Sequence, residues 1–353
     1  MKLLTSADKK SNKLKHIIEY SLPIILAVVF LYIAFLNVDF GDVLRIVSNA
    51  SIFWILIFII VMLSSHYVRA VRWKVILNSV KPDVSIKNLF AALMVGYGVN
   101  SVVPRLGEIS RAVLVGKWEG LSKSSMLGAV IVERVIDIIF LGLAILVSVI
   151  IWTENLYDSF PWLKSALIIS MILMGVVIFF FYLTIKFREK FYGIIIKLLS
   201  RFSEKLAHKV AYIFEMLTHG FASLKGAKNY TLTILLSILM MLLYGLSSYV
   251  GLYTIGMQNI KDVSYEMGWI VMSISAIGVV IPTPGGTGSY HTLAKSALVL
   301  LFGFGENISM AYAVLTHIIS YFVFIFSALF VYFFWNKQHY NFFKIAESEK
   351  ETE

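Results

Sequence analysis

Long apolar runs separated by short polar segments dominate the pattern of this 353-residue chain. A helix of about 20 apolar residues is long enough to cross the hydrocarbon core of a bilayer. Six runs have roughly this length and predict full transmembrane helices, at 17–36, 51–70, 125–152, 164–186, 230–256 and 308–335. The pattern therefore predicts an all-α integral membrane protein.

Two further apolar regions are interrupted by helix-breaking residues. Region 88–123 is broken at Pro104, and region 266–305 is broken by the Pro- and Gly-rich sequence IPTPGGTGS at 281–289. Lys and Arg in short loops mark the cytoplasmic side of a membrane protein. They gather at the N-terminus, in 186–228, and after the second run at Arg69, Arg72, Lys74, Lys81 and Lys87. If these segments are cytoplasmic, region 88–123 must enter the membrane from the cytoplasmic side and return to it. Region 266–305 must likewise enter from the outer side and return to that side.

The predicted fold follows from this sidedness. We expect six full transmembrane helices plus two oppositely inserted re-entrant hairpins in an inverted repeat. The whole chain, 1–353, would form a single polytopic membrane domain with both termini cytoplasmic. Its expected parts are a first repeat at 17–152, a second repeat at 164–336, a basic amphipathic cytoplasmic linker at 188–228 and a polar tail at 337–353. The alternative is that each broken region makes two short crossings, giving about ten crossings in all with the same sidedness.

Composition supports the membrane assignment and narrows the chemistry. The chain is 59% hydrophobic and 15% charged, with a mean hydropathy of +0.81, whereas soluble domains are about 45–50% apolar and about 25% charged. It has no cysteine, which excludes disulfides, thiolate metal ligands and a thiol nucleophile. The first run follows a basic segment, as in a signal peptide, but no small-residue cleavage site follows it. We therefore expect an uncleaved first span.

The first interruption is followed by three charged residues at spacings of three: Arg105, Glu108 and Arg111. An ionisable side chain inside a bilayer costs about 2.5–3.5 kcal/mol on insertion scales, so such groups persist when they are paired or face water or a substrate. On a helix, one carboxylate would lie between two guanidiniums and leave a net positive charge. That arrangement suits an anion such as phosphate. The alternative is that the three charges only neutralise one another.

Further polar groups occur within the apolar segments. Glu133, Arg134 and Asp137 lie within one predicted span and should face the bundle interior, where they could neutralise the arginines or relay protons. The glycines of the second interruption could let backbone N–H groups approach an oxyanion, although a tight turn explains them equally well. His291 and Lys295 share a helix face just beyond it, whereas His66 and His317 are expected to be packing groups.

Four motifs in order carry a family resemblance. They are Arg72-Trp73, Asn100-x3-Pro104-Arg105-x-Gly107-Glu108-x2-Arg111, Glu133-Arg134-x2-Asp137 and Pro282-x-Pro284-Gly285-Gly286-x-Gly288. The chain resembles the transmembrane, flippase-like region of lysylphosphatidylglycerol synthases over roughly 20–335. The resemblance implies a stand-alone member without the aminoacyl-transferase domain, with lipid translocation as its role. His291 stands where relatives often carry Glu, which leaves substrate charge and proton coupling open.

We therefore expect a lipid translocase that moves an anionic lipid or lipid-linked molecule between leaflets of the cell (inner or plasma) membrane. The alternatives are an accessory membrane subunit for a lipid-modifying partner protein, or a membrane-embedded lipid headgroup enzyme with His291 or Glu108 as base. We expect membrane lipids as partners, and no nucleic acid, metal or cofactor; no ATPase motif is present. The expected charge-relay residues are Glu133 and Asp137. The expected substrate-binding residues are Asn100, Arg105, Gly107, Glu108, Arg111, Arg134, Pro284, Gly285, Gly286, Gly288, His291 and Lys295.

Overall fold

The computed structural model describes residues 6–78, 80–152 and 226–335, with scattered positions between 158 and 204, and side chains from Ser21 onward. Every regular element among these residues is helical. In chain order they are α1 (Ser6–Phe35), α2 (Phe40–Ser48), α3 (Ile52–Leu77), α4 (Ile86–Val102), α5 (Leu106–Glu119), α6 (Lys123–Ile151), α10 (Ala227–Thr254), η1 (Met257–Asn259), α11 (Tyr265–Val280), η2 (Pro284–Gly286), α12 (Ser289–Leu300), α13 (Glu306–Phe330) and the π-helix η3 (Val331–Trp335).

Four helical segments of the described chain are long and apolar enough to cross a bilayer: α3, α6, α10, and α13 continued through η3. The segment Ser21–Phe35 of α1, followed by α2 at a bend of 88°, can count as a fifth. These five lie on the predicted runs at 17–36, 51–70, 125–152, 230–256 and 308–335. The predicted span at 164–186 and linker at 188–228 lie almost entirely outside the described residues, and the tail at 337–353 lies wholly outside them. The described helices make the chain a multi-pass α-helical membrane protein.

Several helix starts are encoded by short polar side chains in the loops. Asp39, Ser85, Ser122 and Ser264 each precede a helix, and each side-chain oxygen accepts a hydrogen bond from a backbone N–H in the first turn. Such N-caps satisfy donors that have no partner within the helix. At the C-terminal end of α5, Gly120 takes a left-handed conformation with φ of 66°, which is a common way for a helix to end.

Two pairs of short helices meet at breaks in the chain. The first break, residues 103–105, separates α4 from α5, and the second break, residues 281–288, separates α11 from α12 and contains η2. The four helices have 17, 14, 16 and 12 residues. At 1.5 Å per residue they are about 18–25 Å long, whereas the hydrocarbon core is about 30 Å thick. None of the four is therefore long enough to cross a bilayer as a straight helix.

The two partners of each short pair pack closely. In the first pair, a methyl group on Gly107 would overlap the carbonyl oxygen of Gly96. In the second, a methyl group on Gly278 would lie only 2.6 Å from the carbonyl oxygen of Ser289. Helix α4 also contacts η2, so the second break lies against the first helix pair.

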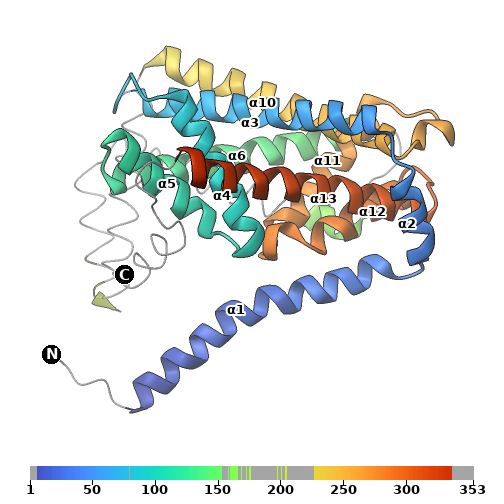
Figure 1. Ribbon diagram of the computed structural model, residues 1–353, viewed down its shortest axis with the longest axis horizontal. Coiled ribbons are helices and arrows are strands. Elements are labelled where there is room, and N and C mark those ends of the chain that lie inside the picture. The colour runs from blue at the N-terminus through green and yellow to red at the C-terminus, as the bar shows by residue number, and fades with distance from the viewer. Residues whose placement is uncertain are drawn as a thin grey trace.

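The long helices surround these two pairs. Helices α3 and α10 lie side by side along one edge of the bundle, and α13 packs against α4 (Figure 1). One apolar core lies among α3 to α6, and a second lies around α2 and α10 to α13. Helix α1 diverges from the bundle, and its C-terminal half contacts α12 and η2 (Figure 1). Its exposed apolar side chains include Leu22, Ile24, Ile25, Val28 and Val29, and they fit contact with lipid rather than water.

Candidate functional site

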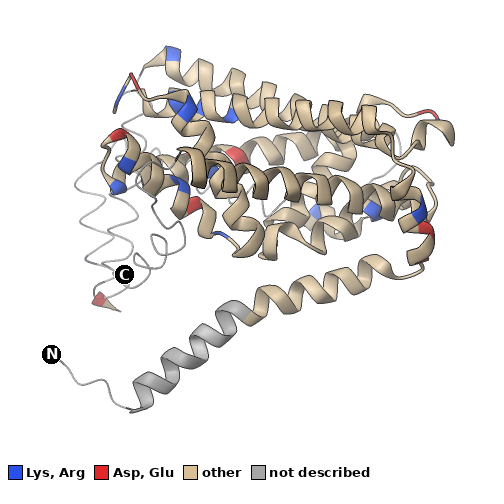
Figure 2. Ribbon diagram, in the orientation of Figure 1, with Lys and Arg blue, Asp and Glu red and all other residues tan. Residues whose placement is uncertain are grey.

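Two carboxylates one turn apart on α6 form the centre of a buried charged network. Glu133 Oε1 accepts a hydrogen bond from Arg69 Nε at 2.6 Å, and Glu133 Oε2 lies 2.8 Å from Arg111 Nη2. Asp137 accepts hydrogen bonds from both Arg69 and Arg72. The arginines come from α3 and α5, so the network ties three helices together. Figure 2 shows that charged positions gather in the half of the bundle that contains α4 and α5.

Polar groups from two more helices complete the surroundings of the arginines. Arg69 Nη1 donates to the Tyr97 hydroxyl of α4 at 3.0 Å, and Arg72 Nη1 donates to Ser237 Oγ of α10 at 2.9 Å. The Arg111 guanidinium carbon lies 4.8 Å from the centre of the Trp73 ring, a cation–π arrangement. These arginines are buried, as is Glu133. Charges out of water persist only when they compensate one another and are hydrogen-bonded.

The network, however, is not fully compensated. Four arginines (Arg69, Arg72, Arg111 and Arg134) face three carboxylates (Glu108, Glu133 and Asp137), which leaves a charge of +1. Within the described part of the chain, Nε and Nη1 of Arg111 have no acceptor, whereas its Nη2 is paired with Glu133 Oε2. Arg72 Nε and Trp73 Nε1 also have no acceptor there. Unfilled donors together with a surplus positive charge suit an oxyanion.

The network runs from the protein surface to its interior. The side-chain exposure is 35% for Arg134, 30% for Glu108, 16% for Asp137 and 0% for Glu133. Arg134 connects the outer part to the inner part, because its Nε lies 3.3 Å from Glu108 Oε1 and its Nη1 lies 3.7 Å from Asp137 Oδ2. The arginines of the network therefore lie at different depths, from the partly exposed Arg134 to the buried Arg72 and Arg111.

The expectation that Glu108 lies between Arg105 and Arg111 is wrong. Glu108 pairs instead with Arg134, and Arg111 pairs with Glu133. Arg105 is exposed and precedes α5 in a left-handed conformation with φ of 65°. Helical spacing therefore does not bring its side chain onto the face of α5. The interpretation that the α6 acids neutralise an arginine of the broken segment agrees with the Arg111–Glu133 pair.

Asn100 and Gly107 hold the first break together. Asn100 Oδ1 accepts a hydrogen bond from the Gly107 N–H at 2.7 Å, and Gly107 faces the Gly96 carbonyl group so closely that no side chain would fit. A buried backbone donor at a helix start needs such a partner. In this structure both residues fix the geometry of the α4–α5 turn, which positions Arg111 on α5.

The glycines of the second break face other parts of the protein. Gly285, Gly286 and Gly288 have φ of 55°, 81° and 85°, which residues with a side chain rarely adopt. A methyl group on Gly285 would overlap the Tyr321 ring of α13, and one on Gly288 would lie 2.6 Å from the Ala27 carbonyl oxygen of α1. The Tyr321 hydroxyl also donates to the Pro284 carbonyl group at 2.6 Å. The α1 and α13 helices thus occupy the space beside Gly285 and Gly288, where we expected a headgroup.

His291 and Lys295 make separate contacts with neighbouring helices. Lys295 Nζ donates to the carbonyl oxygens of Ala34 and Leu36 at 2.9 and 2.7 Å and pairs with Glu306 at 2.6 Å. It therefore fixes the end of α1. His291 contacts His317, whose expected role as a packing group stays a prediction. The contacts among the described residues do not join these groups to the arginine network.

Sequence reasoning missed the central arginines of the network. The charge pattern places Arg69 and Arg72 in a cytoplasmic basic stretch, but α3 continues to Leu77 and buries both. The signal was present in the apolar helical pattern around them, YVRAVRWKVIL, which does not end at residue 70. The partners Tyr97 and Ser237 carry no such signal, because single hydroxyl groups are common in apolar helices.

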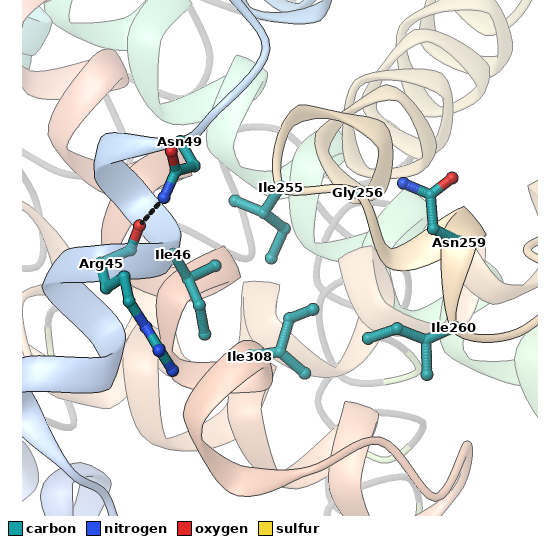
Figure 3. Close-up of a pocket in the computed structure, with 8 residues that line it drawn as sticks. All are labelled: Arg45, Ile46, Asn49, Ile255, Gly256, Asn259, Ile260 and Ile308. Carbon is teal, nitrogen blue, oxygen red and sulfur yellow. Dashed lines mark hydrogen bonds between the residues drawn. The ribbon is translucent and has the colours of Figure 1, made fainter.

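A cavity of about 290 Å³ lies elsewhere in the molecule, between α2, η1 and α13 (Figure 3). Half of its lining residues are isoleucines, Asn49 and Asn259 add polar groups, and the one charged side chain beside it is Arg45, which pairs with Asp42. It shares no residue with the arginine network. Because the one charged side chain beside it is largely exposed and already paired, we place the candidate site at the network.

Comparison with known proteins assigns the family. The profile of the family described as "Lysylphosphatidylglycerol synthase TM region" matches residues 20–328. A UPF0104 membrane protein of Methanothermobacter thermautotrophicus is 24% identical over 321 residues, which cover 84% of this chain and 90% of the relative. A UPF0104 membrane protein of Methanocaldococcus jannaschii is 26% identical over 121 residues, covering 32% of this chain and 35% of that protein. No solved structure matches the chain. The chain therefore belongs to the lysylphosphatidylglycerol synthase TM region family.

Proposed function

We propose that this protein moves an anionic lipid, or a lipid-linked molecule with an anionic headgroup, between the leaflets of the cell membrane. The observation that carries the proposal is Arg111. Its guanidinium is buried, lies over Trp73 and has donors without acceptors, within a network whose charge is +1. Ionisable groups at membrane depth commonly mark substrate paths. Guanidinium groups match the geometry of phosphate oxygens.

The surplus charge gives a physical reason for translocation. A headgroup with one negative charge would bring the network to neutrality. A neutral assembly costs much less to hold in a low-dielectric interior than an isolated phosphate does. Arg134, which is partly exposed, would receive the headgroup, and Arg111 and Arg72 would hold it deeper. Glu133 and Asp137 would keep the arginines compensated while the site is empty.

We further propose that the two short helix pairs are re-entrant hairpins that enter from opposite sides, with both chain termini cytoplasmic. Their helices are too short to span a bilayer, and α4 contacts η2 at the second break. The element order supports an inverted repeat. Helices α3 and α10 pack together, and each is followed by a broken pair and then by a long helix, α6 or α13. Broken segments at matching positions of inverted halves commonly surround a transporter's substrate site.

The test is a leaflet-accessibility assay in proteoliposomes. Phosphatidylglycerol with a fluorescent acyl chain is placed in both leaflets, and a membrane-impermeant reductant then destroys the outer-leaflet fluorescence. Transfer appears as loss of the inner-leaflet signal. Arg134→Gln removes a partly exposed charge of the network, and Arg111→Lys keeps the buried charge but loses the planar donor fork. The matched control is Arg45→Gln, an arginine whose side chain is 73% exposed and which lies outside the network.

We expect both network variants to slow transfer strongly and the Arg45→Gln control to transfer at the wild-type rate. Because Arg45 borders the cavity of Figure 3, the control also tests whether that cavity is the site instead. Wild-type rates in both network variants, with folding verified by gel filtration, would refute the assignment of the site. Slowed transfer in the control alone would move the site to the cavity.

A further inference from the structure

Two histidines meet beside the second break, away from the arginine network. His291 lies on the first turn of α12 and His317 on α13, with His291 Nε2 and His317 Nδ1 3.2 Å apart. The Gly288 N–H donates to His291 Nδ1 at 3.2 Å, and His317 Nε2 lies 3.1 Å from the Gly285 carbonyl oxygen. All four ring nitrogens are therefore engaged, and both outer partners belong to the second break.

These contacts fix the position of each hydrogen when both rings are neutral. Because Gly288 donates to His291 Nδ1, that nitrogen carries no hydrogen, and the ring hydrogen must be on Nε2. His291 Nε2–H then donates to His317 Nδ1, which accepts. The hydrogen of His317 is left on Nε2, where it donates to the Gly285 carbonyl group. The neutral pair is thus one directional chain of hydrogen bonds from Gly288 to Gly285.

An added proton cannot be accommodated in this chain. It must bind one of the two bare nitrogens, His291 Nδ1 or His317 Nδ1. On His291 Nδ1 it would oppose the Gly288 N–H. On His317 Nδ1 it would oppose His291 Nε2–H, and moving that hydrogen to Nδ1 would again oppose Gly288. Either position therefore breaks a contact that holds the second break closed.

The surroundings provide little compensation for the added charge. Tyr290 and Tyr321 contact the rings, and the other charged groups of α12 and α13 are Lys295 and Glu306, which pair with each other. The remaining ionisable side chains described on the packed helices α1, α4 and α11 are Tyr32, Lys87, Tyr97, Tyr265 and Glu266. Helix α2, which packs against α13, carries Asp42 and Arg45, and these pair with each other. The contacts of the described residues bring no carboxylate to either imidazole. An uncompensated cation at a buried position favours a rearrangement that hydrates it. Because His317 is partly exposed, a proton from water can reach the histidine pair.

We propose that His291 and His317 form a proton-binding site whose protonation opens the second break. Resting on the proposed function, we assign the pair the coupling of proton uptake to lipid translocation. The chemistry is a simple proton addition from water to an imidazole nitrogen. It replaces the Gly288-to-His291 or the His291-to-His317 hydrogen bond with a hydrated imidazolium, and no covalent bond other than N–H is made.

The test is hydrogen–deuterium exchange of the full chain in lipid nanodiscs at pH 7.5 and 5.5. The measured peptide covers 281–291, and the first break at 103–105 serves as the reference for the intrinsic pH dependence of exchange. One variant, His291→Asn, keeps an acceptor near the position of Nδ1 but does not titrate. In a second variant, His317→Gln is added, which keeps a donor near the Gly285 carbonyl group.

We expect wild-type exchange in 281–291, relative to the reference, to rise at low pH by up to about tenfold per pH unit, since one proton is linked to opening. In the double variant this rise should vanish, while protection at pH 7.5 stays near the wild-type level. A wild-type peptide without a pH response, or a double variant that keeps the full response, would overturn the proposal. The readout needs no translocation, so it is independent of the Arg111 test.

Discussion

Replacing Glu133 with Gln removes the negative charge at the centre of the arginine network and keeps the side-chain shape. In the native protein this carboxylate lies 2.6 Å from Arg69, 2.8 Å from Arg111 and 3.4 Å from Arg72, and it is completely buried. The amide can still accept a hydrogen bond, but Arg69 and Arg72 are then left with Asp137 as their carboxylate partner, and Arg111 is left with none.

The expected loss of stability is large. Removing one partner of a buried ion pair costs about 3–5 kcal/mol, because the charge that remains is uncompensated. Since Glu133 contacts three arginines, we expect Glu133→Gln to lower the free energy of unfolding by an amount in the upper part of that range. Adding Arg111→Met removes one surplus charge. The double variant should therefore lose less than the sum of the single losses, by about 0.5–3 kcal/mol.

Equilibrium unfolding in mixed micelles with a denaturing detergent, followed by tryptophan fluorescence, measures both quantities. The control is Asp42→Asn, which breaks the exposed pair with Arg45 and should cost less than about 1 kcal/mol. If Glu133→Gln costs no more than this control, or if the Glu133 and Arg111 substitutions add without coupling, the buried network does not hold these helices together.

Two further substitutions test the packing that positions the site, in the same unfolding assay. Gly107→Ala should lower the free energy of unfolding by about 1–3 kcal/mol, because its methyl group would overlap a carbonyl oxygen of α4. The control is Gly142→Ala in α6, where no neighbouring atom lies within 4 Å of the added methyl group. This control should be neutral or stabilise the protein by up to about 1 kcal/mol. Equal effects at the two glycines would contradict the close packing of α4 and α5. Lys295→Met should lower the free energy of unfolding by about 1–3 kcal/mol, because two carbonyl groups at the end of α1 lose their donor. Amide hydrogen exchange at residues 34–38 should also rise. Unchanged exchange there would contradict the role of Lys295 in fixing the end of α1.

The apolar pattern predicted most of the helices and the positions of both breaks, for identifiable reasons. Proline lacks the N–H that continues a helix, and Pro104 lies in the first break. Positive φ angles favour glycine, and three of them lie in or beside η2. These are local effects, so the local sequence reports them. Re-entrance and the inverted repeat depend on the surrounding bilayer and stay predictions.

The partners of the charged residues could not be predicted in the same way. Arg69 and Glu133 are 64 residues apart, and His291 and His317 are 26 apart. Local spacing suggested pairing among Arg105, Glu108 and Arg111, but the chain enters α5 through a left-handed residue, and α6 supplies the actual partners. Tertiary packing determines such contacts, and the local spacing in a single sequence does not predict which distant helices pack together.

In the proposed function, the arginine network selects and carries a negatively charged headgroup. The most direct measurement compares transfer of phosphatidylglycerol and phosphatidylcholine, with identical fluorescent acyl chains, in the same wild-type proteoliposomes. We expect fast transfer of phosphatidylglycerol, much slower transfer of phosphatidylcholine, and loss of this difference in Arg111→Lys. Equal transfer of the two lipids by the wild-type protein, or a preference for phosphatidylcholine, would contradict the proposed function.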